Sequence, residues 1–324
     1  MARIDGTDGA DRIFAGSDAF NLISAGAGDD LIFAGPGRDF AGGGDGFDTL
    51  VTGIAYADGA NLSFSGDRYI VGGPNGDIAV GVERFIFTDT VVLVEPQRGL
   101  EGAVALPFTE LNPIQDALRA VLRTEAPDLF AEQTALTIRS GQLTFSGYLD
   151  LLVQNAQHST TPAILMQAAV FGTIPTSEKL DSLAQFARAQ YDYYANTLKS
   201  ASAELGPYEA LGRGLASTVE FSSAFAAASD PAFIDTAYGL VFGRAATDAQ
   251  HDALLAQVTY FEGLYRNAGI QAAQADLEAK GAVYGQMIGH AAADPSLGYT
   301  ATANAVLRDF ALGDTSHYGA VFGA

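Results

Sequence analysis

A repeat of nine residues near the N-terminus constrains this chain more than any other feature. Glycine and aspartate recur at fixed positions between residues 6 and 51, and most units carry an apolar residue at their eighth position. The units read GTDGADRIF, GSDAFNLIS, AGAGDDLIF, AGPGRDFAG and GGDGFDTLV, with Ala15 inserted after the first. Such a period indicates stacked structural units that bury a shared core. A flexible acidic linker is the alternative, but a linker has no reason to keep the apolar positions.

The residue types within each unit indicate a binding site for a hard cation. Glycine permits the positive φ angles of a tight turn and leaves backbone carbonyl oxygens accessible. The sixth position supplies a carboxylate oxygen, which suits Ca²⁺ better than a soft metal. The predicted side-chain ligands are Asp11, Asn21, Asp30, Asp39 and Asp48. The glycines predicted to shape the calcium-binding turns are Gly9, Gly28, Gly37 and Gly46.

The template Gly-Gly-x-Gly-x-Asp-x-apolar-x resembles the calcium-binding repeat of the RTX (repeats-in-toxin) family. The resemblance implies a parallel β-roll, in which successive strands fall on alternate sheets and turns two units apart stack on one edge. Ligands should then pair about eighteen residues apart, as Asp30 with Asp48, Asn21 with Asp39, and Asp11 with Asp30. Without metal the carboxylates repel and the core is thin, so calcium binding and folding should be coupled.

Three further regions follow the repeats. Residues 53–95 alternate like strands between turn residues and are expected to cap the roll, with no chemistry of their own. Residues 96–113 contain three prolines and are predicted to be a linker. Residues 114–324 are rich in alanine with helical spacing. The predicted fold class is therefore multidomain α and β, with a β-roll domain over 1–95 and an all-α domain at the C-terminal end.

The helical half contains an internal repeat. The segment AVFGTIPTSEKLDSL (169–183) matches LVFGRAATDAQHDAL (240–254) at an offset of 71 residues. Each copy predicts a helix that ends at a glycine after phenylalanine, followed by a helix capped by Thr176 or Thr247. Thr247 and Gln250 have the spacing of a capping box. The half is predicted to consist of two related helical modules, about 139–225 and 226–324.

Composition excludes several function classes. The chain has 17 lysines and arginines against 38 aspartates and glutamates, a net charge of −21, which argues against nucleic-acid binding. It has no cysteine and therefore no disulfide or catalytic thiol. The N-terminus lacks the apolar core of a cleavable signal peptide, and the most apolar stretch, 163–172, is too short to span a membrane. Export is therefore expected through a type I secretion machinery, with the tail HYGAVFGA as the candidate signal.

Parts of the helical half resemble bacterial surface proteins. The stretches beginning SGQLTFSGYLDLLVQNAQHS and LGYTATANAVLRDF are similar to the anchoring region of Caulobacter-type S-layer proteins. FSSAFAAASDPAFIDTAYGLVFGRAAT resembles a helical module of secreted surface proteins. The resemblance implies an α-helical region that binds the O-polysaccharide of lipopolysaccharide. The S-layer protein carries its anchor before its RTX repeats, whereas here the anchor-like region follows them, as in S-layer-associated secreted proteases.

Motifs for catalysis are missing from the sequence. It contains no His-Glu-x-x-His, no Gly-x-Ser-x-Gly and no phosphate-binding Gly-Lys-Ser/Thr loop, so no enzymatic activity is expected. A glycan site would combine tyrosine rings with amides and a cation. Candidates are Tyr191, Tyr193, Tyr260, Asn196, Arg266 and Asn267. The alternative is that such tyrosines belong to the core at helical spacing, which is favoured for Tyr194 and Tyr265 because they align in the repeat.

Together these features predict a secreted, calcium-binding protein on the cell surface. It would attach non-covalently to outer-membrane polysaccharide, with no nucleic-acid partner and no insertion into the membrane. Two alternatives remain open: the non-catalytic C-terminal part of a secreted RTX hydrolase or protease, and a self-assembling component of an S-layer or biofilm matrix. Calcium is the one cofactor expected.

Overall fold

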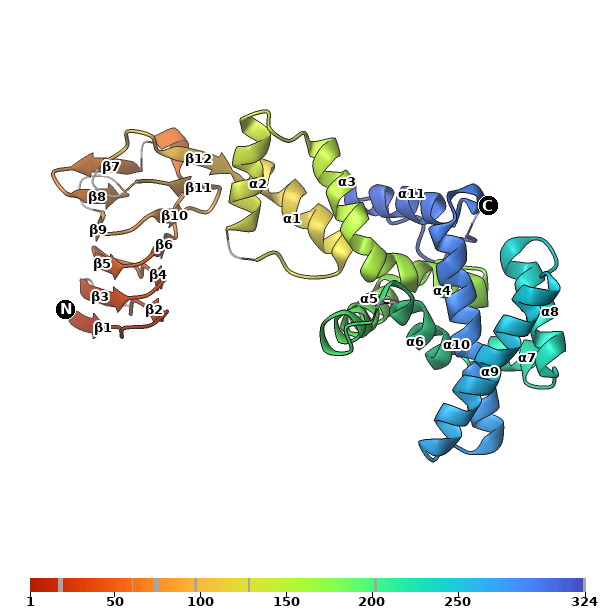
Figure 1. The fold of residues 1–324 in the computed structure, drawn as a ribbon. Coiled ribbons are helices and arrows are strands. Elements are labelled where there is room, and N and C mark those ends of the chain that lie inside the picture. Colours follow the sequence, from red (N-terminus) through yellow and green to blue (C-terminus); the bar gives the residue numbers. More distant parts are fainter. Residues whose placement is uncertain are drawn as a thin grey trace. The chain divides into compact units, whose positions relative to one another are not determined.

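A computed structural model describes residues 1–16, 20–59, 61–72, 76–95, 98–127, 129–200 and 203–322. Positions 17–19 of the second nonapeptide, the start of the expected linker at 96–97 and the last two residues of the tail lie outside the described residues. The chain divides into two compact units, Met1–Asn112 with Ala131–Ala135, and Pro113–Phe130 with Leu136–Ala324. The first unit contains the strands, and helices make up most of the second (Figure 1).

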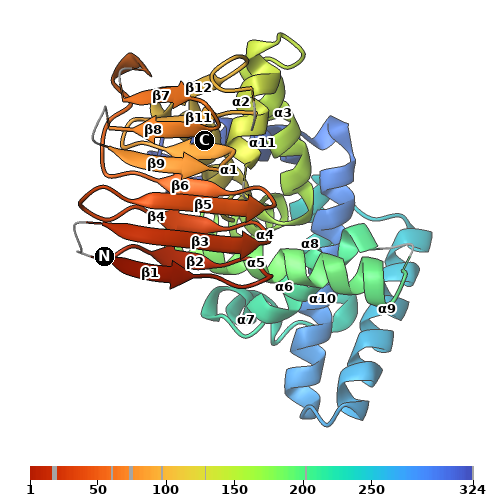
Figure 2. The same cartoon turned by 90° about the vertical axis from the view of Figure 1, so that its left-hand side faces the viewer.

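The nonapeptides form short strands that alternate between two sheets. The strands are β1 (Ala2–Asp5), β2 (Arg12–Phe14), β3 (Asn21–Ala27), β4 (Leu31–Phe33), β5 (Phe40–Asp45) and β6 (Thr49–Val51). Odd-numbered strands pair in parallel in one sheet, and even-numbered strands pair in parallel in the other (Figure 2). Ala2 lies opposite Asn21, whereas Leu22 lies opposite Phe40. The register is one residue longer in the first pairing because that span contains Ala15.

The second half of this unit extends both sheets. Its strands are β7 (Leu62–Ser65), β8 (Arg68–Val71), β9 (Asp77–Val80), β10 (Arg84–Ile86), β11 (Thr90–Leu93) and β12 (Val104–Pro107). The sheet orders are β1-β3-β5-β9-β8-β7 and β12-β11-β10-β6-β4-β2. β9 and β10 continue the parallel pairing, and the outer strands pair antiparallel.

The prediction that residues 96–113 form a linker is wrong for the second half of that range. Val104–Pro107 forms β12, and the helix α1 (Phe108–Leu122) begins at the next residue. β12 is the outermost strand of its sheet, where Pro107 is tolerated because an edge strand need not donate every N–H. Proline content therefore suggested a linker where the chain instead closes a sheet.

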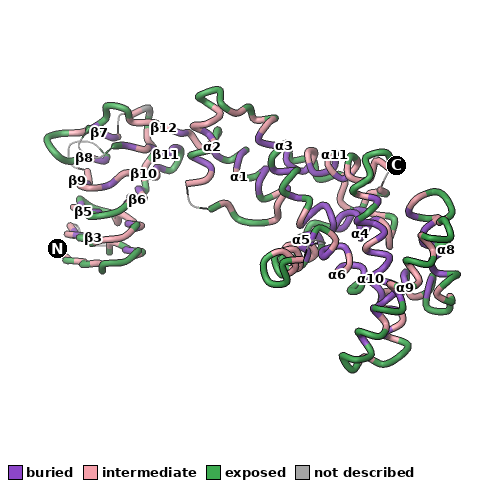
Figure 3. Tube along the Cα trace, in the orientation of Figure 1, coloured by how far each residue is buried: buried purple, intermediate pink, exposed green. Residues whose placement is uncertain are grey.

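The space between the sheets holds the core of the first unit. The eighth-position residues predicted to fill it are all buried: Ile13, Ile23, Ile32, Ala41 and Leu50. They are aliphatic, with Ala41 the smallest, and the cap strands add the aromatic Tyr69, Phe85 and Phe87, which are buried as well. Figure 3 shows buried stretches alternating with exposed turns along this unit. The core is thus thin beneath the repeats and thick beneath the cap.

Helices make up most of the second unit. After α1 the helices are α2 (Phe130–Arg139), α3 (Phe145–Asn155), α4 (Thr160–Phe171), α5 (Ser177–Asp192), α6 (Gly206–Leu215), α7 (Val219–Phe225), α8 (Asp230–Phe242), α9 (Asp248–Asn267), α10 (Ala272–Ala293) and α11 (Tyr299–Ala311). Of these, α2 contributes Ala131–Ala135 to the first unit. α4 contains most of the apolar stretch 163–172 and is buried over most of its length. Among the described residues, no helix combines the length and apolar character required to cross a membrane.

The internal repeat corresponds to equivalent helix ends. α4 and α8 both end at phenylalanine, and the following glycines, Gly172 and Gly243, take φ angles of 70° and 65°. Thr247 forms the predicted capping box with Gln250 at the start of α9. Thr176 is the N-cap residue of α5, but its side chain makes no cap hydrogen bond. The sequence therefore predicted the starts of both helices correctly, and the cap hydrogen bond of one of them.

The helices α6 and α10 approach each other through glycine. A Cβ atom on Gly285 would lie 2.0 Å from the carbonyl oxygen of Tyr208, and one on Gly212 would lie 2.2 Å from the carbonyl oxygen of Gly281. These distances are shorter than van der Waals contact, so only glycine lets the two backbones meet here. α6 follows α5 and α10 follows α9, so the contact joins the two repeated halves of the helical unit.

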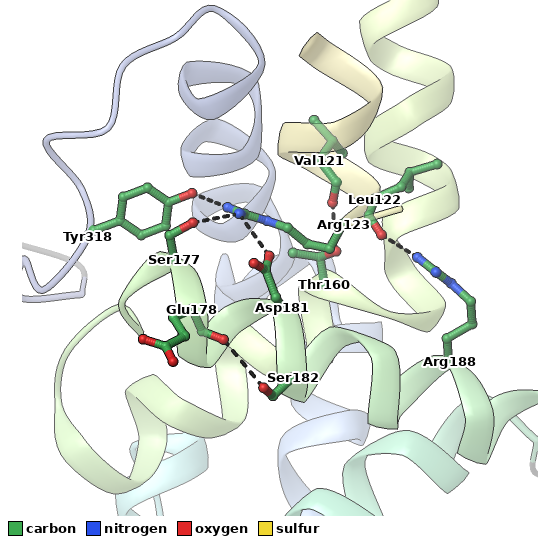
Figure 4. A network of polar contacts seen from close by, with 10 residues as sticks. All are labelled: Val121, Leu122, Arg123, Thr160, Ser177, Glu178, Asp181, Ser182, Arg188 and Tyr318. Carbon is green, nitrogen blue, oxygen red and sulfur yellow. Dashed lines mark hydrogen bonds and ion pairs between the residues drawn. The ribbon is translucent and has the colours of Figure 1, made fainter. Parts of the chain in front are cut away.

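The C-terminal segment is held against the helical unit by Arg123, the residue after α1 (Figure 4). Its guanidinium donates to the hydroxyl of Tyr318 and to Asp181 Oδ1 at 3.1 Å. The same group lies over the Tyr318 ring, 5.4 Å from the centroid. Thr173 forms an antiparallel bridge with Val321. The described part of the tail is therefore packed on its own domain.

Candidate calcium-binding edges

The sixth-position aspartates form a ladder along one edge of the strand unit. The backbone N–H of Asp11 donates to Asp30 Oδ1 at 2.8 Å, and the N–H of Asp30 donates to Asp48 Oδ1 at 3.0 Å. The parallel register places each turn beside the turn two units earlier. The structure thus brings together two of the three pairs that the spacing predicts.

The third predicted pair lies on the opposite edge. The backbone N–H and the Nδ2 of Asn21 both donate to Asp39 Oδ1, each at 2.8 Å. An amide replaces a carboxylate at this position, so this pair carries one negative charge instead of two. The Asn21–Asp39 pair is therefore expected to attract a cation less strongly than the acidic pairs of the first edge.

The second carboxylate oxygens carry the strongest indication of a bound cation. Asp30, Asp39 and Asp48 are at most 2 % exposed, and each uses Oδ1 in the ladder. Their Oδ2 atoms are buried without a hydrogen-bond partner. A buried carboxylate costs several kcal/mol unless a counter-charge accompanies it. These oxygens fit a hard cation bound along the edges.

Backbone oxygens are needed to complete such a site. Among the residues that the structure describes, no three carboxylate or imidazole groups gather around one point. Ca²⁺ accepts backbone carbonyl oxygens as readily as carboxylates and needs six to eight oxygens in all. A carboxylate pair with turn carbonyls therefore fits Ca²⁺ and does not fit a site built from side chains alone.

Three of the four predicted turn glycines have positive φ angles: Gly28 at 104°, Gly37 at 131° and Gly46 at 138°. A Cβ atom on Gly46 would lie 2.3 Å from the carbonyl oxygen of Gly28, so the stacked turns leave no room for a side chain. For Gly9 a positive φ was expected and is not found. The first turn is closed by Thr7 instead, whose N–H donates to Asp11 Oδ2 at 2.6 Å.

The ladders continue into residues 53–95, where no such chemistry was expected. The N–H of Asp39 donates to Asp77 Oδ1 at 2.8 Å, and the N–H of Asp48 donates to Glu83 Oε2 at 2.6 Å. The sequence holds a signal for Asp77, because GGPNGDIAV has glycine, glycine, aspartate and alanine at positions one, two, six and eight of the nonapeptide. The β7–β8 hairpin separates this unit from the others and breaks the period.

Burial perturbs the acids at the end of the first edge. Desolvation, together with the carboxylates of Glu83, Asp30 and Asp29, raises the pKa of Asp48 to about 6. Burial also raises the pKa of Glu83. Protons therefore compete with calcium at this edge well above the ordinary aspartate range.

We predict that calcium affinity falls as the pH is lowered through about 6, because Asp48 must be deprotonated to bind the ion. In the metal-free protein the stability of the fold depends on pH with the opposite sign. The folded pKa of Asp48 lies above its unfolded value of about 3.9, so the contribution of Asp48 to stability is complete below that value and is lost as the pH rises through about 6. Calorimetric titration with Ca²⁺ at pH 5.5 and 7.5 tests this. Equal affinity at the two pH values would contradict it.

The candidate glycan residues lie in different local surroundings. Tyr193 and Tyr260 are exposed at 48 % and 66 %. Tyr191 stacks on the ring of His158, with the centroids 3.9 Å apart. Arg266 forms an ion pair with Glu262. The remaining two candidates, Asn196 and Asn267, are exposed.

The repeat-equivalent tyrosines meet one carboxylate. The hydroxyl of Tyr194 donates to Glu209 Oε1 at 2.8 Å. Burial, and to a lesser degree the negative charge of the same Glu209 carboxylate, raises the pKa of Tyr265 to about 12. The Arg213 guanidinium lies 4.3 Å from the centroid of the Tyr265 ring. Tyr265 is buried, as expected of a core residue, whereas Tyr194 is half-buried beside the exposed Tyr193. Sequence reasoning did not single out Glu209 or Arg213, which have no counterpart in a known motif.

Comparison with protein families matches residues 3–19 and 16–50 to the RTX calcium-binding nonapeptide repeat, in four copies. A search of curated proteins found no significant match to the chain. The matched residues include all five predicted side-chain ligands, and repeats of this kind are typical of secreted proteins. The N-terminal part of this chain therefore consists of RTX calcium-binding nonapeptide repeats, and Ca²⁺ is the ion that such repeats bind.

Proposed function

We propose that the chain is a secreted protein of the cell surface that holds calcium in an N-terminal β-roll and attaches through its helical unit to outer-membrane polysaccharide. The observation that carries the proposal is the row of buried Oδ2 atoms without a partner on Asp30, Asp39 and Asp48. Such a row favours folding where calcium is abundant, which is outside the cell. The polysaccharide would be the O-antigen of lipopolysaccharide.

The strand order supports the β-roll. Consecutive repeat strands alternate between the two sheets, and each pairs in parallel with the strand two units away. Aliphatic residues at the eighth positions fill the space between the sheets beneath the repeats. In this proposal the cations along the edges replace the stabilisation that a thicker core would supply.

The helical unit supports the attachment to a glycan. Tyr193 is exposed beside Tyr194, which is hydrogen-bonded to Glu209, and Tyr260 is exposed on α9. Exposed aromatic rings near carboxylates and amides suit the apolar faces and hydroxyl groups of sugars. A net charge of −21 repels anionic lipid, so contacts to a polysaccharide would depend on ring stacking and hydrogen bonds. In this proposal the unit is a binding domain without catalytic activity.

We predict that labelled protein binds cells bearing O-polysaccharide in the presence of calcium and fails to bind cells that lack it. Replacing Tyr193 and Tyr260 by alanine together should weaken binding about thirtyfold, because each ring contributes about 1 kcal/mol. Phe14→Ala is the matched control, since Phe14 is also an exposed aromatic but lies in the strand unit. Equal binding to cells with and without the polysaccharide would rule out the proposed attachment.

A further inference from the structure

We propose that Glu83 completes a calcium site with Asp48 beyond the last nonapeptide, and that this site fastens the cap strands to the repeats. The family match ends at residue 50, so Glu83 lies outside the RTX repeats. It precedes β10, which pairs in parallel with β6, the last strand of the repeats. The proposal rests on calcium binding by the repeats and is independent of attachment to a glycan.

Glu83 continues the pattern of backbone hydrogen bonds that links the aspartates of the repeats. Within the repeats, the N–H of Asp30 donates to the Asp48 carboxylate, and the N–H of Thr49 donates back to the carbonyl of Asp30 at 2.8 Å. At the cap, the N–H of Asp48 donates to the Glu83 carboxylate, and the N–H of Arg84 donates back to the carbonyl of Asp48 at 3.1 Å. The longer side chain of glutamate makes the same contact as the aspartate two units earlier.

Oxygen atoms converge beside this rung. The position that a Cβ atom would take on Gly43 lies 2.4 Å from Asp48 Oδ2 and 1.9 Å from the carbonyl oxygen of Gly81. Asp48 is fully buried, and its Oδ2 has no hydrogen-bond partner. A buried carboxylate oxygen next to a carbonyl oxygen is a pair of ligands that suits Ca²⁺.

The same convergence occurs at the first turn of the repeats. A Cβ atom on Gly6 would lie 2.0 Å from the carbonyl oxygen of Ala25 and 2.9 Å from Asp11 Oδ2. Gly6 and Gly43 are both the first residue of their nonapeptide. The arrangement of carbonyl and carboxylate seen at the first RTX turn is therefore present where the partner strand belongs to the cap.

No cationic side chain of the described residues forms an ion pair with Asp48 or Glu83. The nearest in sequence, Arg84, forms an ion pair with Glu132 instead. The carboxylates of Asp29 and Asp30 add negative charge around Asp48. A divalent cation would relieve this repulsion, and it would join turns that lie 35 residues apart, the separation of Asp48 and Glu83.

The test is a calcium count on the full chain carrying Glu83→Gln. We expect equilibrium dialysis to find one Ca²⁺ fewer per chain than in the unsubstituted protein, and the thermal midpoint of the strand unit in calcium to fall. Glu95→Gln is the control, because Glu95 is an exposed glutamate of the same unit whose carboxylate forms an ion pair with Arg98. An unchanged calcium count in Glu83→Gln would overturn the proposal.

A second variant covers a failure of Glu83→Gln to fold. Glu83→Asp keeps the charge and one carboxylate, so we expect it to fold in calcium and to bind the last ion more weakly. If Glu83→Asp binds all ions with unchanged affinity and Glu83→Gln is unfolded at every calcium concentration, the carboxylate acts in the metal-free fold and the proposal is wrong. Loss of one ion with unchanged binding to cells would support this site whatever the fate of the glycan proposal.

Discussion

Chelation of calcium is expected to unfold the strand unit while the helical unit stays folded. The repeats bury few apolar residues, chiefly one aliphatic residue at the eighth position of each unit, and the ladders leave carboxylate oxygens buried without a partner. Each site occupied at a hundred times its dissociation constant adds about 2.7 kcal/mol to the folded state, so several sites together are comparable to the stability of a typical domain. The helical unit has its own core, with α4 buried over most of its length.

Hydrogen exchange measured by mass spectrometry on the full chain separates the two units. Peptides covering β1 to β6 should lose protection in chelator and regain it when Ca²⁺ is added, whereas peptides covering α4 to α10 should be unaffected. Mg²⁺ is the control ion, because it demands tighter octahedral geometry and keeps its water, and it should restore little protection. Protected repeat strands in chelator would contradict the proposed coupling of calcium and folding.

The second large effect is expected at the crossing of α6 and α10. Gly285→Ala places a methyl group 2.0 Å from the carbonyl oxygen of Tyr208, and that carbonyl belongs to a helix backbone that cannot rotate away. Overpacking of this kind costs about 1–3 kcal/mol, and the involvement of two backbones puts the expected loss at the upper end. Denaturant unfolding of the helical unit measures it as a lower midpoint.

Gly263→Ala is the matched control for this prediction. Gly263 also lies inside a helix, α9, but a Cβ atom there would meet nothing within 4 Å. Alanine is favoured over glycine in a helix by up to about 1 kcal/mol, so the same substitution should stabilise the protein at Gly263. The two substitutions should thus have opposite signs. A Gly285→Ala protein as stable as its Gly263→Ala counterpart would show that the helices do not meet as described.

The sequence carried most of the information about the repeats. Each nonapeptide is a local unit, and its period of nine residues indicates which apolar residues face inward. The pairs Asp11–Asp30 and Asp30–Asp48 were predicted from that period together with the resemblance to an RTX β-roll, which implies that turns two units apart stack. The helix ends at Gly172 and Gly243 could also be predicted from the sequence, because a left-handed glycine ends a helix through contacts within a few residues.

For the glycan candidates, helical periodicity predicted the exposure of only some of the tyrosines. Tyr193 and Tyr260 were selected because, unlike Tyr194 and Tyr265, they do not align in the repeat, and both are exposed. Tyr191 was selected on the same ground and stacks on His158 instead. Periodicity says which side of a helix faces the core, but not which neighbouring element covers the other side.

The sequence by itself determined the calcium chemistry, the stacking of the turns and the repeated helical half, because each of these depends on residues less than about twenty positions apart or on a strict period. Only the tertiary structure decided that Asp77 and Glu83 extend the ladders, at separations of 38 and 35 residues from their partners. A hairpin and irregular turns lie between, and no local rule specifies their length. The meeting of Gly212 and Gly285 is of the same kind, since helix pairing is selected by packing of complete surfaces.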